Sequence, residues 1–264
     1  MKLSAIPICF PGLMNGRPEP PFEEWVEMAR GLSLDGIELY HRFFDDWRDD
    51  HLLQVRCLLD DRGLAISMFT DDHELSSPDA AERRAQVARL HRGVDIALLV
   101  GAPQVRVTAG WPPRDMPRDA ILENVVAALR EALPYARERG VWLALEDHPR
   151  FGTAIADFTA VLEAVASPDL KVNLDTSNPM LAGDTAVDLA RIVADRVVHV
   201  HASDRRADLE HSVAGEGVVD FPAIFGLLKA AGFDGWVSYE AGGDRGLPGL
   251  RDGLDYLRRT WDAA

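Results

Sequence analysis

The chain has 264 residues, 47% of them hydrophobic, which is enough for one large α/β domain or two small ones. Lys plus Arg number 28 and Asp plus Glu number 43, so the net charge is −15 and phosphate backbones would be repelled. Cys9 and Cys57 are too few for a disulfide framework, and no apolar run reaches membrane length. We therefore expect a cytoplasmic protein with no nucleic-acid or membrane partner; the sequence leaves open whether it forms a homo-oligomer.

Short β-type runs alternate with longer stretches whose apolar residues recur at spacings of three and four, as in amphipathic helices. The predicted strands are residues 3–9, 36–41, 64–70, 104–110, 141–147, 171–176, 197–202 and 235–241. The predicted helices are residues 22–32, 51–63, 80–101, 121–140, 156–167, 186–196, 221–232 and 250–261. Several of these helices end in a glycine suited to a left-handed C-terminal position, namely Gly63, Gly101, Gly140 and Gly232.

Eight strand–helix units of about 30 residues predict an α/β fold, a (β/α)8 TIM barrel formed by residues 1–264 as a single domain. A doubly wound open sheet is the main rival, but it normally has a G-x-G-x-x-G turn after an early strand. The first strand here leads instead into "FPGLMNGRPEPP". The Pro-rich stretches 17–21 and 110–117 are then loops at the carboxyl ends of strands, where barrels carry their chemistry.

Four consecutive predicted strands end in a residue that can bind a metal. "LALEDH" gives Glu146, "VNLDTSN" gives Asp175, "VHVHASD" gives His201 and "VSYEAGG" gives Glu240. Each residue alone is more often a cap or a solvated edge group, but three clustered anions repel one another unless a cation is present. The oxygen-rich set predicts one divalent metal ion, Mn²⁺ first, with Mg²⁺ or Co²⁺ as alternatives.

His199 lies two residues before His201 and therefore on the same face of the predicted strand. It sits one layer deeper in the barrel, away from the strand end. We expect it to support the metal ligands through a hydrogen bond rather than to bind the metal itself.

The first three of these motifs, followed by "GEGVVDFPAIFGLLKAAGFDGWVSYE", which contains the fourth strand end, closely resemble the xylose isomerase-like TIM barrels, the sugar phosphate isomerase/epimerase family. The resemblance covers essentially the whole chain. It implies a metal held by Glu146, Asp175, His201 and Glu240, with Glu146 and Glu240 also acting as acid/base residues on a bound sugar. Two carboxylates beside the reacting carbon can remove and return a proton, while a metal stabilises the charge of an enediolate.

The chain departs from the ketose 3-epimerases of this family, which puts a free ketohexose in doubt as the substrate. Their His three residues after the Asp ligand is Asn178 here, and two further family positions are Gly152 and Ala207. Arg205 or Arg206 lies close enough to replace the missing arginine. The residues assigned to substrate binding are His148, Asn178, Arg205, Glu38 and Trp111. Loop or core roles without substrate contact remain the alternatives for His148, Glu38 and Trp111.

The predicted function is metal-dependent isomerisation or epimerisation of a small polyhydroxy-ketone. A dehydratase or lyase acting on a keto-cyclitol, 3-dehydroshikimate or a 3-keto-glycoside would share the enolisation step and is the main alternative. An endonuclease IV-like enzyme is a remote one, because Asn178, Thr70 and Thr108 stand where its additional histidines would be needed. A non-enzymatic sugar-binding protein would not need four ligands.

Overall fold

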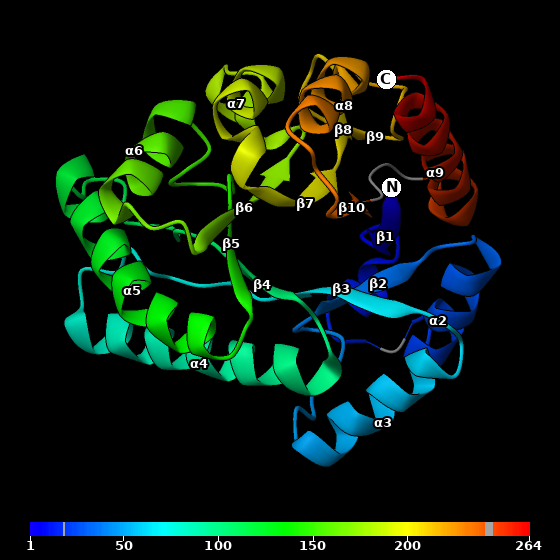
Figure 1. The fold of residues 1–264 in the computed structure, drawn as a ribbon, viewed down its shortest axis with the longest axis horizontal. Helices are drawn as coiled ribbons and strands as arrows, with labels where there is room; N and C mark the ends of the chain where they lie inside the picture. The colour runs from blue at the N-terminus through cyan, green and yellow to red at the C-terminus, as the bar shows by residue number, and fades with distance from the viewer. Residues whose placement is uncertain (18, 241–244) are drawn as a thin grey trace.

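Eight parallel strands lie side by side in one sheet that curves into a nearly closed barrel (Figure 1). The computed structural model describes residues 1–17, 19–240 and 245–264. The sheet order is β1-β10-β7-β6-β5-β4-β3-β2. These strands are β1 (Lys2–Ile6), β2 (Gly36–Tyr40), β3 (Ala65–Thr70), β4 (Gln104–Val107), β5 (Trp142–Glu146), β6 (Leu170–Asp175), β7 (Val197–Ala202) and β10 (Trp236–Glu240).

Two hydrogen bonds join the two ends of this strand order. The backbone N–H of Asp35, just before β2, donates to the carbonyl oxygen of Leu3 in β1 at 2.9 Å. The Leu3 N–H in turn donates to Asp35 Oδ2 at 2.8 Å. These contacts bring β1 and β2 together and nearly close the ring.

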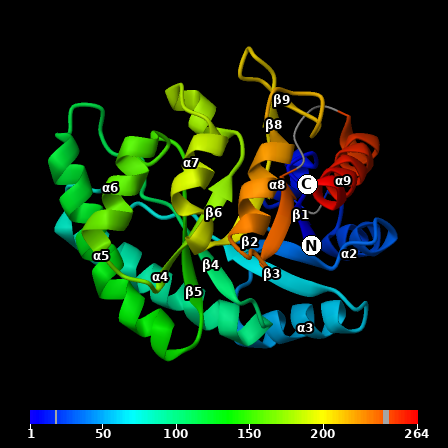
Figure 2. The same cartoon turned by 45° about the horizontal axis from the view of Figure 1, so that its top comes forward.

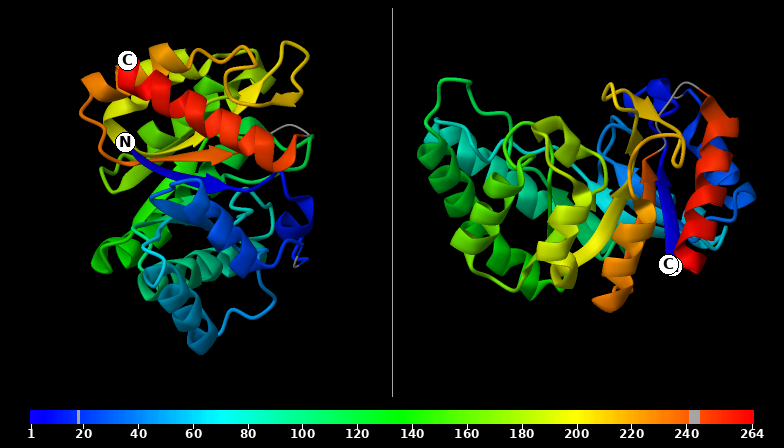
Figure 3. Two further views of the ribbon diagram at one scale, coloured as in Figure 1. Left: turned by 90° about the vertical axis from the view of Figure 1, so that its right-hand side faces the viewer. Right: turned by 90° about the horizontal axis from the view of Figure 1, so that it is seen from above.

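Helices surround the strands on the outside of the barrel (Figures 1 and 3). They are α1 (Pro11–Met14), α2 (Phe22–Gly31), α3 (Asp49–Asp60), α4 (Ala80–Val100), α5 (Arg118–Glu138), α6 (Ile155–Val165), α7 (Ala186–Val193), α8 (Phe221–Ala230) and α9 (Gly246–Ala263), with short 3₁₀ turns η1 (Asn178–Ala182) and η2 (Ala194–Arg196). None of the helices among the described residues combines the length and the apolar character needed to cross a lipid bilayer.

The two faces of the strands carry different side chains. The face toward the helices is apolar and contributes residues such as Val105, Val107 and Val200 to one large hydrophobic cluster. The alternate positions point into the barrel, because successive strand residues face opposite sides. Many of these inward residues are buried polar groups: Ser4, Glu38, Arg106, Glu146, Asn173, Asp175, His199, His201 and Ser238.

The predicted TIM barrel is confirmed, and the doubly wound sheet is excluded by the strand order. Each predicted strand and helix is present, with ends shifted by a few residues. The predicted strand 3–9 ends at Ile6, since Pro7 has no N–H to offer a neighbouring strand. Residue 18 of the predicted loop 17–21 and residue 241 of the predicted strand 235–241 lie outside the described residues.

A small hairpin that the sequence did not predict follows β7. It consists of β8 (Asp204–Arg205) and β9 (His211–Ser212), paired antiparallel, and it projects beyond the ends of the barrel strands (Figure 2). The Asp204 carboxylate accepts backbone N–H groups from Gly215 at 2.8 Å and Gly217 at 3.0 Å. A Cβ on Gly217 would come within 2.1 Å of Asp204 Oδ1, so only glycine fits this loop.

Candidate metal centre and active site

The carboxyl ends of β5, β6 and β7 bring Glu146, Asp175 and His201 together inside the barrel. All three residues are 1% exposed. Each offers one potential ligand atom, and these atoms lie within 4.8 Å of one another. The separation of 55 residues between Glu146 and His201 is bridged by the fold because parallel strands end at the same side of the barrel.

His201 lies between two carboxylates. Its Nδ1 is 2.6 Å from Glu146 Oε1, and its Nε2 is 3.0 and 3.1 Å from the two oxygens of Glu38. Burial by itself would lower the pKa of His201, but Glu38 and Glu146 outweigh burial and raise that pKa well above its ordinary value. Without a cation, the ring must carry both protons to satisfy both carboxylates.

Asp175 is held in place by three hydrogen-bond donors to one oxygen. Its Oδ1 accepts the backbone N–H groups of Ser177 and Asn178, both at 2.7 Å, and the hydroxyl of Ser203 at 2.9 Å. Asp175 therefore accepts the N–H groups at the start of the η1 turn and also belongs to the Glu146–His201 group. Asp175 thus makes the local hydrogen bonds that are usual for Asp before Thr-Ser-Asn, and it also lies in the cluster.

Glu240 ends β10 at the rim of this group. Its Oε2 is 3.9 Å from His201 Nδ1, and its side chain is 23% exposed, in contrast to the fully enclosed Glu146. Its largely buried position raises the pKa of Glu240 to about 8, and the nearby anions Asp175 and Glu146 add to the shift while His201 opposes it. Of the part of the chain that the structure describes, His201 is the one cationic group within 4.0 Å of this carboxylate.

Glu38 and His199 lie deeper in the barrel, and both are 0% exposed. His199 Nδ1 is 2.9 Å from Asn173 Oδ1, and its Nε2 is 3.8 Å from Glu38 Oε2. Burial lowers the pKa of His199 to about 3, so the ring is neutral. His199 therefore lies one layer below His201, as the sequence predicts, but its hydrogen bond goes to Asn173 and not to a candidate metal ligand. Glu38 is enclosed rather than open to the barrel mouth.

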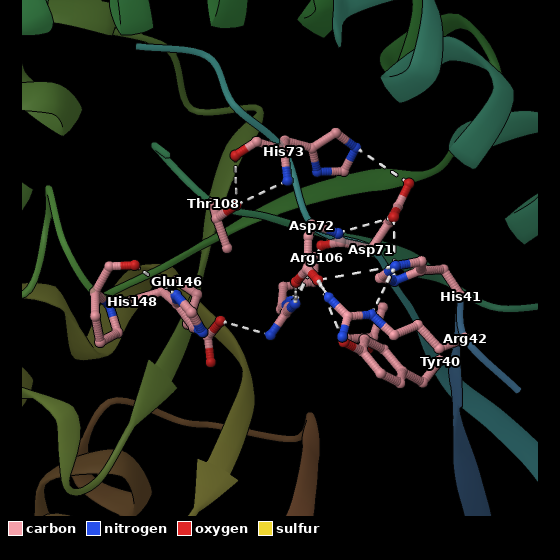
Figure 4. Close-up of polar contacts among 12 residues, drawn as sticks. Tyr40, His41, Arg42, Asp71, Asp72, His73, Arg106, Thr108, Glu146 and His148 are labelled. Carbon is pink, nitrogen blue, oxygen red and sulfur yellow. Dashed lines mark hydrogen bonds and ion pairs between the residues drawn. The ribbon is translucent and has the colours of Figure 1, made fainter. Parts of the chain in front are cut away.

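Arg106 of β4 is a functional candidate that the sequence reasoning missed. Figure 4 shows its guanidinium between Glu146 on one side and Asp72 on the other. Nη1 donates to Glu146 Oε2 at 3.0 Å, and Nη2 donates to Asp72. Burial alone would raise the pKa of Glu146, yet Arg106 and His201 hold that pKa below its ordinary range. The signal in the sequence was a charged residue inside the apolar run "QVRVTAG".

Arg106→Met is expected to lower the free energy of unfolding of the metal-free protein by about 3–5 kcal/mol. The Arg106 side chain is 6% exposed, and its loss would leave buried Glu146 with only one of its two cationic partners, His201. Urea unfolding followed by circular dichroism measures the effect. Adding Mn²⁺ should reduce the difference in unfolding free energy between this variant and wild type, because a bound cation would compensate the charge of Glu146.

Arg118→Met is the matched control, since Arg118 forms an ion pair with Asp157 but is 50% exposed. Its removal should cost at most about 1 kcal/mol. Equal unfolding free energies for the Arg106 and Arg118 variants would show that Arg106 does not compensate buried charge.

Of the residues assigned to substrate binding, Glu38 lies in β2 beneath His201, whereas Trp111, His148, Asn178 and Arg205 lie in the segments that follow β4, β5, β6 and β7. Trp111 is 37% exposed, and its ring meets that of His148 edge to face, with ring centroids 5.3 Å apart. Arg205 Nε donates to Ser177 Oγ at 3.2 Å, and this hydroxyl lies 2.6 Å from Ser203 Oγ, which donates to Asp175. Asn178 touches Asp175 through its backbone.

The donor set suits a hard divalent cation. It offers carboxylate oxygens and one imidazole nitrogen, the ligand types that Mn²⁺ and Mg²⁺ accept. His201 Nδ1 and Glu146 Oε1 are 2.6 Å apart and share a hydrogen bond. A cation bound by this group would replace the hydrogen bond as the partner of His201 and Glu146 and would offset the charge of Asp175 and Glu240. The residues present therefore fit a metal ion.

The fold and the site together define a (β/α)8 barrel with a buried carboxylate–histidine cluster at the carboxyl ends of its strands. The chain belongs to the xylose isomerase-like TIM barrel family, whose sequence profile matches residues 26–260. This confirms the family resemblance drawn from the sequence motifs.

Several known proteins are similar to this chain. A ketose 3-epimerase from Arthrobacter globiformis is 27% identical over 247 residues, which is 89% of this chain and 83% of that protein. An inosose dehydratase from Lacticaseibacillus casei is 29% identical over 139 residues, 45% of this chain and 46% of that protein. The solved structure of an L-ribulose 3-epimerase superposes with a TM-score of 0.83 at 18% identity, covering 99% of this chain and 94% of that one, which supports the fold.

These matches differ in how much of each relative they span. The match to the inosose dehydratase covers less than half of that protein's length, and the match to the ketose 3-epimerase covers most of it. The names of these relatives include both epimerase and dehydratase activities, so the family by itself leaves the reaction open.

Proposed function

We propose that this protein is a divalent-metal-dependent enzyme that moves a proton on the carbon next to the carbonyl of a small polyhydroxy-ketone, as an isomerase or epimerase. The observation that carries the proposal is the buried group of Glu146, Asp175 and His201 at the carboxyl ends of three adjacent strands. In TIM barrels, catalytic residues are drawn from this end of several strands. Similarity to a ketose 3-epimerase over most of both chains supports the reaction class.

Glu146, Asp175, His201 and Glu240 would hold the ion, with Mn²⁺ as the first candidate and Mg²⁺ or Co²⁺ as alternatives. When bound, a divalent ion supplies positive charge that stabilises negative charge developing on a substrate oxygen. Three carboxylates and one imidazole favour such hard ions over a structural zinc.

The geometry suggests different roles for the two proposed catalytic glutamates. Both oxygens of Glu146 are engaged, Oε1 by His201 and Oε2 by Arg106. Glu240 is partly exposed at the mouth and lies 3.9 Å from His201, so it is the carboxylate better placed to reach a substrate C–H. Glu240 then removes or returns the proton on one face of the bound sugar, and Glu146 acts as the acid/base residue on the other face.

The surrounding loops would bind the substrate. Trp111 and His148 offer an aromatic edge on one side, where a sugar ring could stack. Arg205, with Ser177 and Asn178, lies on the Asp175 side and can contact hydroxyl groups or a single anionic group. The charge of Arg106 is already paired with Asp72 and Glu146. The part of the site around Arg106 therefore favours a neutral, hydroxyl-rich substrate.

A dehydratase acting on a keto-cyclitol is the second candidate, and the similarity to an inosose dehydratase supports it. Dehydration would begin with the same proton removal and differ only in the group that leaves from the next carbon. Asn178 also stands where the ketose 3-epimerases carry histidine, which favours a substrate other than a free ketohexose.

Incubation in D₂O with ketoses, ketose phosphates and keto-cyclitols tests the proposal. With Mn²⁺ present, we expect NMR to show deuterium entering the carbon next to the carbonyl of one of these substrates, with an epimer, an isomer or an elimination product. Rigorous chelation should abolish the exchange, and Mn²⁺ should restore it. Full activity after verified metal removal would contradict metal dependence, and cleavage of abasic DNA without exchange on any ketone would contradict the reaction class.

A further inference from the structure

Glu38 is completely enclosed and lies directly beneath His201. Both of its carboxylate oxygens are within 3.1 Å of His201 Nε2, and Thr70 donates its hydroxyl to Oε1. Glu38, Thr70 and His199 are all 0% exposed. His201 lies between Glu38 and the rim residue Glu240, so Glu38 contacts His201 rather than a substrate at the barrel mouth.

The two nitrogens of His201 point in opposite directions, and this decides which one is free to bind a cation. Nδ1 faces Glu146 and Glu240, the mouth side of the barrel. Nε2 faces Glu38. A neutral imidazole has one N–H and one lone pair, so a ring that binds a cation through Nδ1 must keep its proton on Nε2 and needs an acceptor there.

Glu38, His199 and His201 also form a compact group, with potential ligand atoms within 4.8 Å of one another. The hydrogen bonds argue against a second ion in this lower group. An ion bound by Glu38, His199 and His201 would require the lone pair of His201 Nε2. The same ring could then also bind an ion beside Glu146 and Asp175 only by losing both of its protons. His199 is already fixed by Asn173 through Nδ1. These contacts support one ion, bound by the group of Glu146, Asp175 and His201.

We propose that Glu38 is a positioning residue that accepts the Nε2–H of His201 and thereby presents Nδ1 to the metal ion. This inference rests on the proposed function, in which His201 is a metal ligand. It replaces the substrate contact expected for Glu38 from the sequence. Carboxylates that hold the far nitrogen of a metal-binding histidine orient the ring and increase its basicity, and their loss typically weakens metal affinity about 10–100-fold.

Two substitutions separate the hydrogen bond from the charge. Glu38→Met removes the acceptor at similar side-chain length, and we expect Mn²⁺ affinity, measured by electron paramagnetic resonance, to fall about 10–100-fold. Glu38→Gln keeps a carbonyl oxygen for the Nε2–H, and its amide can donate to Thr70 or toward the free lone pair of His199. We expect the Gln variant to keep most of the Mn²⁺ affinity that the Met variant loses. In both variants, the KM for substrate at saturating Mn²⁺ should stay near that of wild type.

Ser67→Ala is the matched control. Ser67 is 0% exposed and donates to the Ile37 carbonyl at 3.2 Å. Its loss removes a buried hydrogen bond between β2 and β3, the strands of Glu38 and Thr70, without touching His201. Its Mn²⁺ affinity should equal that of wild type. Thermal unfolding of all variants shows whether a loss of affinity reflects a loss of folding.

The outcomes separate this inference from the proposed function. Wild-type protein that binds no Mn²⁺ would overturn both. Wild-type binding with unchanged affinity in Glu38→Met, or a rise in KM without a change in affinity, would overturn the positioning role alone. If Glu38→Met does not fold, ¹⁵N NMR of the His201 ring in Mg²⁺-loaded wild type decides: a proton on Nε2 supports the role, and a proton on Nδ1 overturns it. Two tightly bound ions per chain would also overturn it.

Discussion

Asp175→Asn is expected to weaken the binding of Mn²⁺ by at least about 100-fold, beyond the range typical of residues that only support metal ligands. The substitution removes a negative charge next to Glu146 and His201. It leaves a carbonyl oxygen that can still accept the N–H groups of Ser177 and Asn178. The fold should therefore survive, and calorimetric titration of the metal-free protein with Mn²⁺ measures the loss.

Asp157→Asn is the matched control, because Asp157 pairs with the half-exposed Arg118 and is not one of the clustered potential ligands. It should bind Mn²⁺ as wild type does. Near-native Mn²⁺ affinity in Asp175→Asn, with unfolding temperatures equal to wild type, would remove Asp175 from the ligand set.

Glu240→Gln is expected to lose mainly turnover, about 10²–10⁴-fold at saturating Mn²⁺, the usual contribution of a general acid or base. The amide keeps the shape of the side chain and one ligand oxygen but cannot take a proton. Its position at the rim, 23% exposed, leaves Glu146, Asp175 and His201 in place to hold the ion. Product formation and deuterium exchange are measured on the substrate that the D₂O experiment identifies.

Glu216→Gln provides the control, because Glu216 is 53% exposed and pairs with Arg245 outside the cluster. Its turnover should match wild type. Wild-type turnover by Glu240→Gln with Mn²⁺ bound would rule out the acid/base role and leave Glu240 as a ligand at most.

The alternation of the sequence was sufficient to predict the barrel. Apolar runs with a period of two and stretches with spacings of three and four recur eight times, and each predicted element is present. The predicted left-handed glycines are also confirmed, with φ of +68° at Gly63 and +81° at Gly101. Strand ends were less accurate, because hydrogen bonding to neighbouring strands decides where a strand stops. The run 104–110, for example, is a strand only over Gln104–Val107.

The candidate cluster was predictable for the same reason. Glu146, Asp175 and His201 each end an apolar strand, and parallel strands in a barrel end on one side. Strand periodicity also places His199 on the inner face with His201, because residues two apart share a face. What each of these groups contacts across the barrel was not contained in that pattern.

The sequence by itself determined the fold and placed Glu146, Asp175 and His201 near the carboxyl ends of their strands, because both follow from local periodicity. Only the tertiary structure decided which charges meet. Arg106 faces Glu146, and Glu38 lies under His201, although 40 and 163 residues separate these pairs along the chain. Such pairings depend on barrel closure and on strand register, which shifts between Ile37 and Glu38. A shift of this kind changes which inward side chains are neighbours, and no spacing within one strand reveals it.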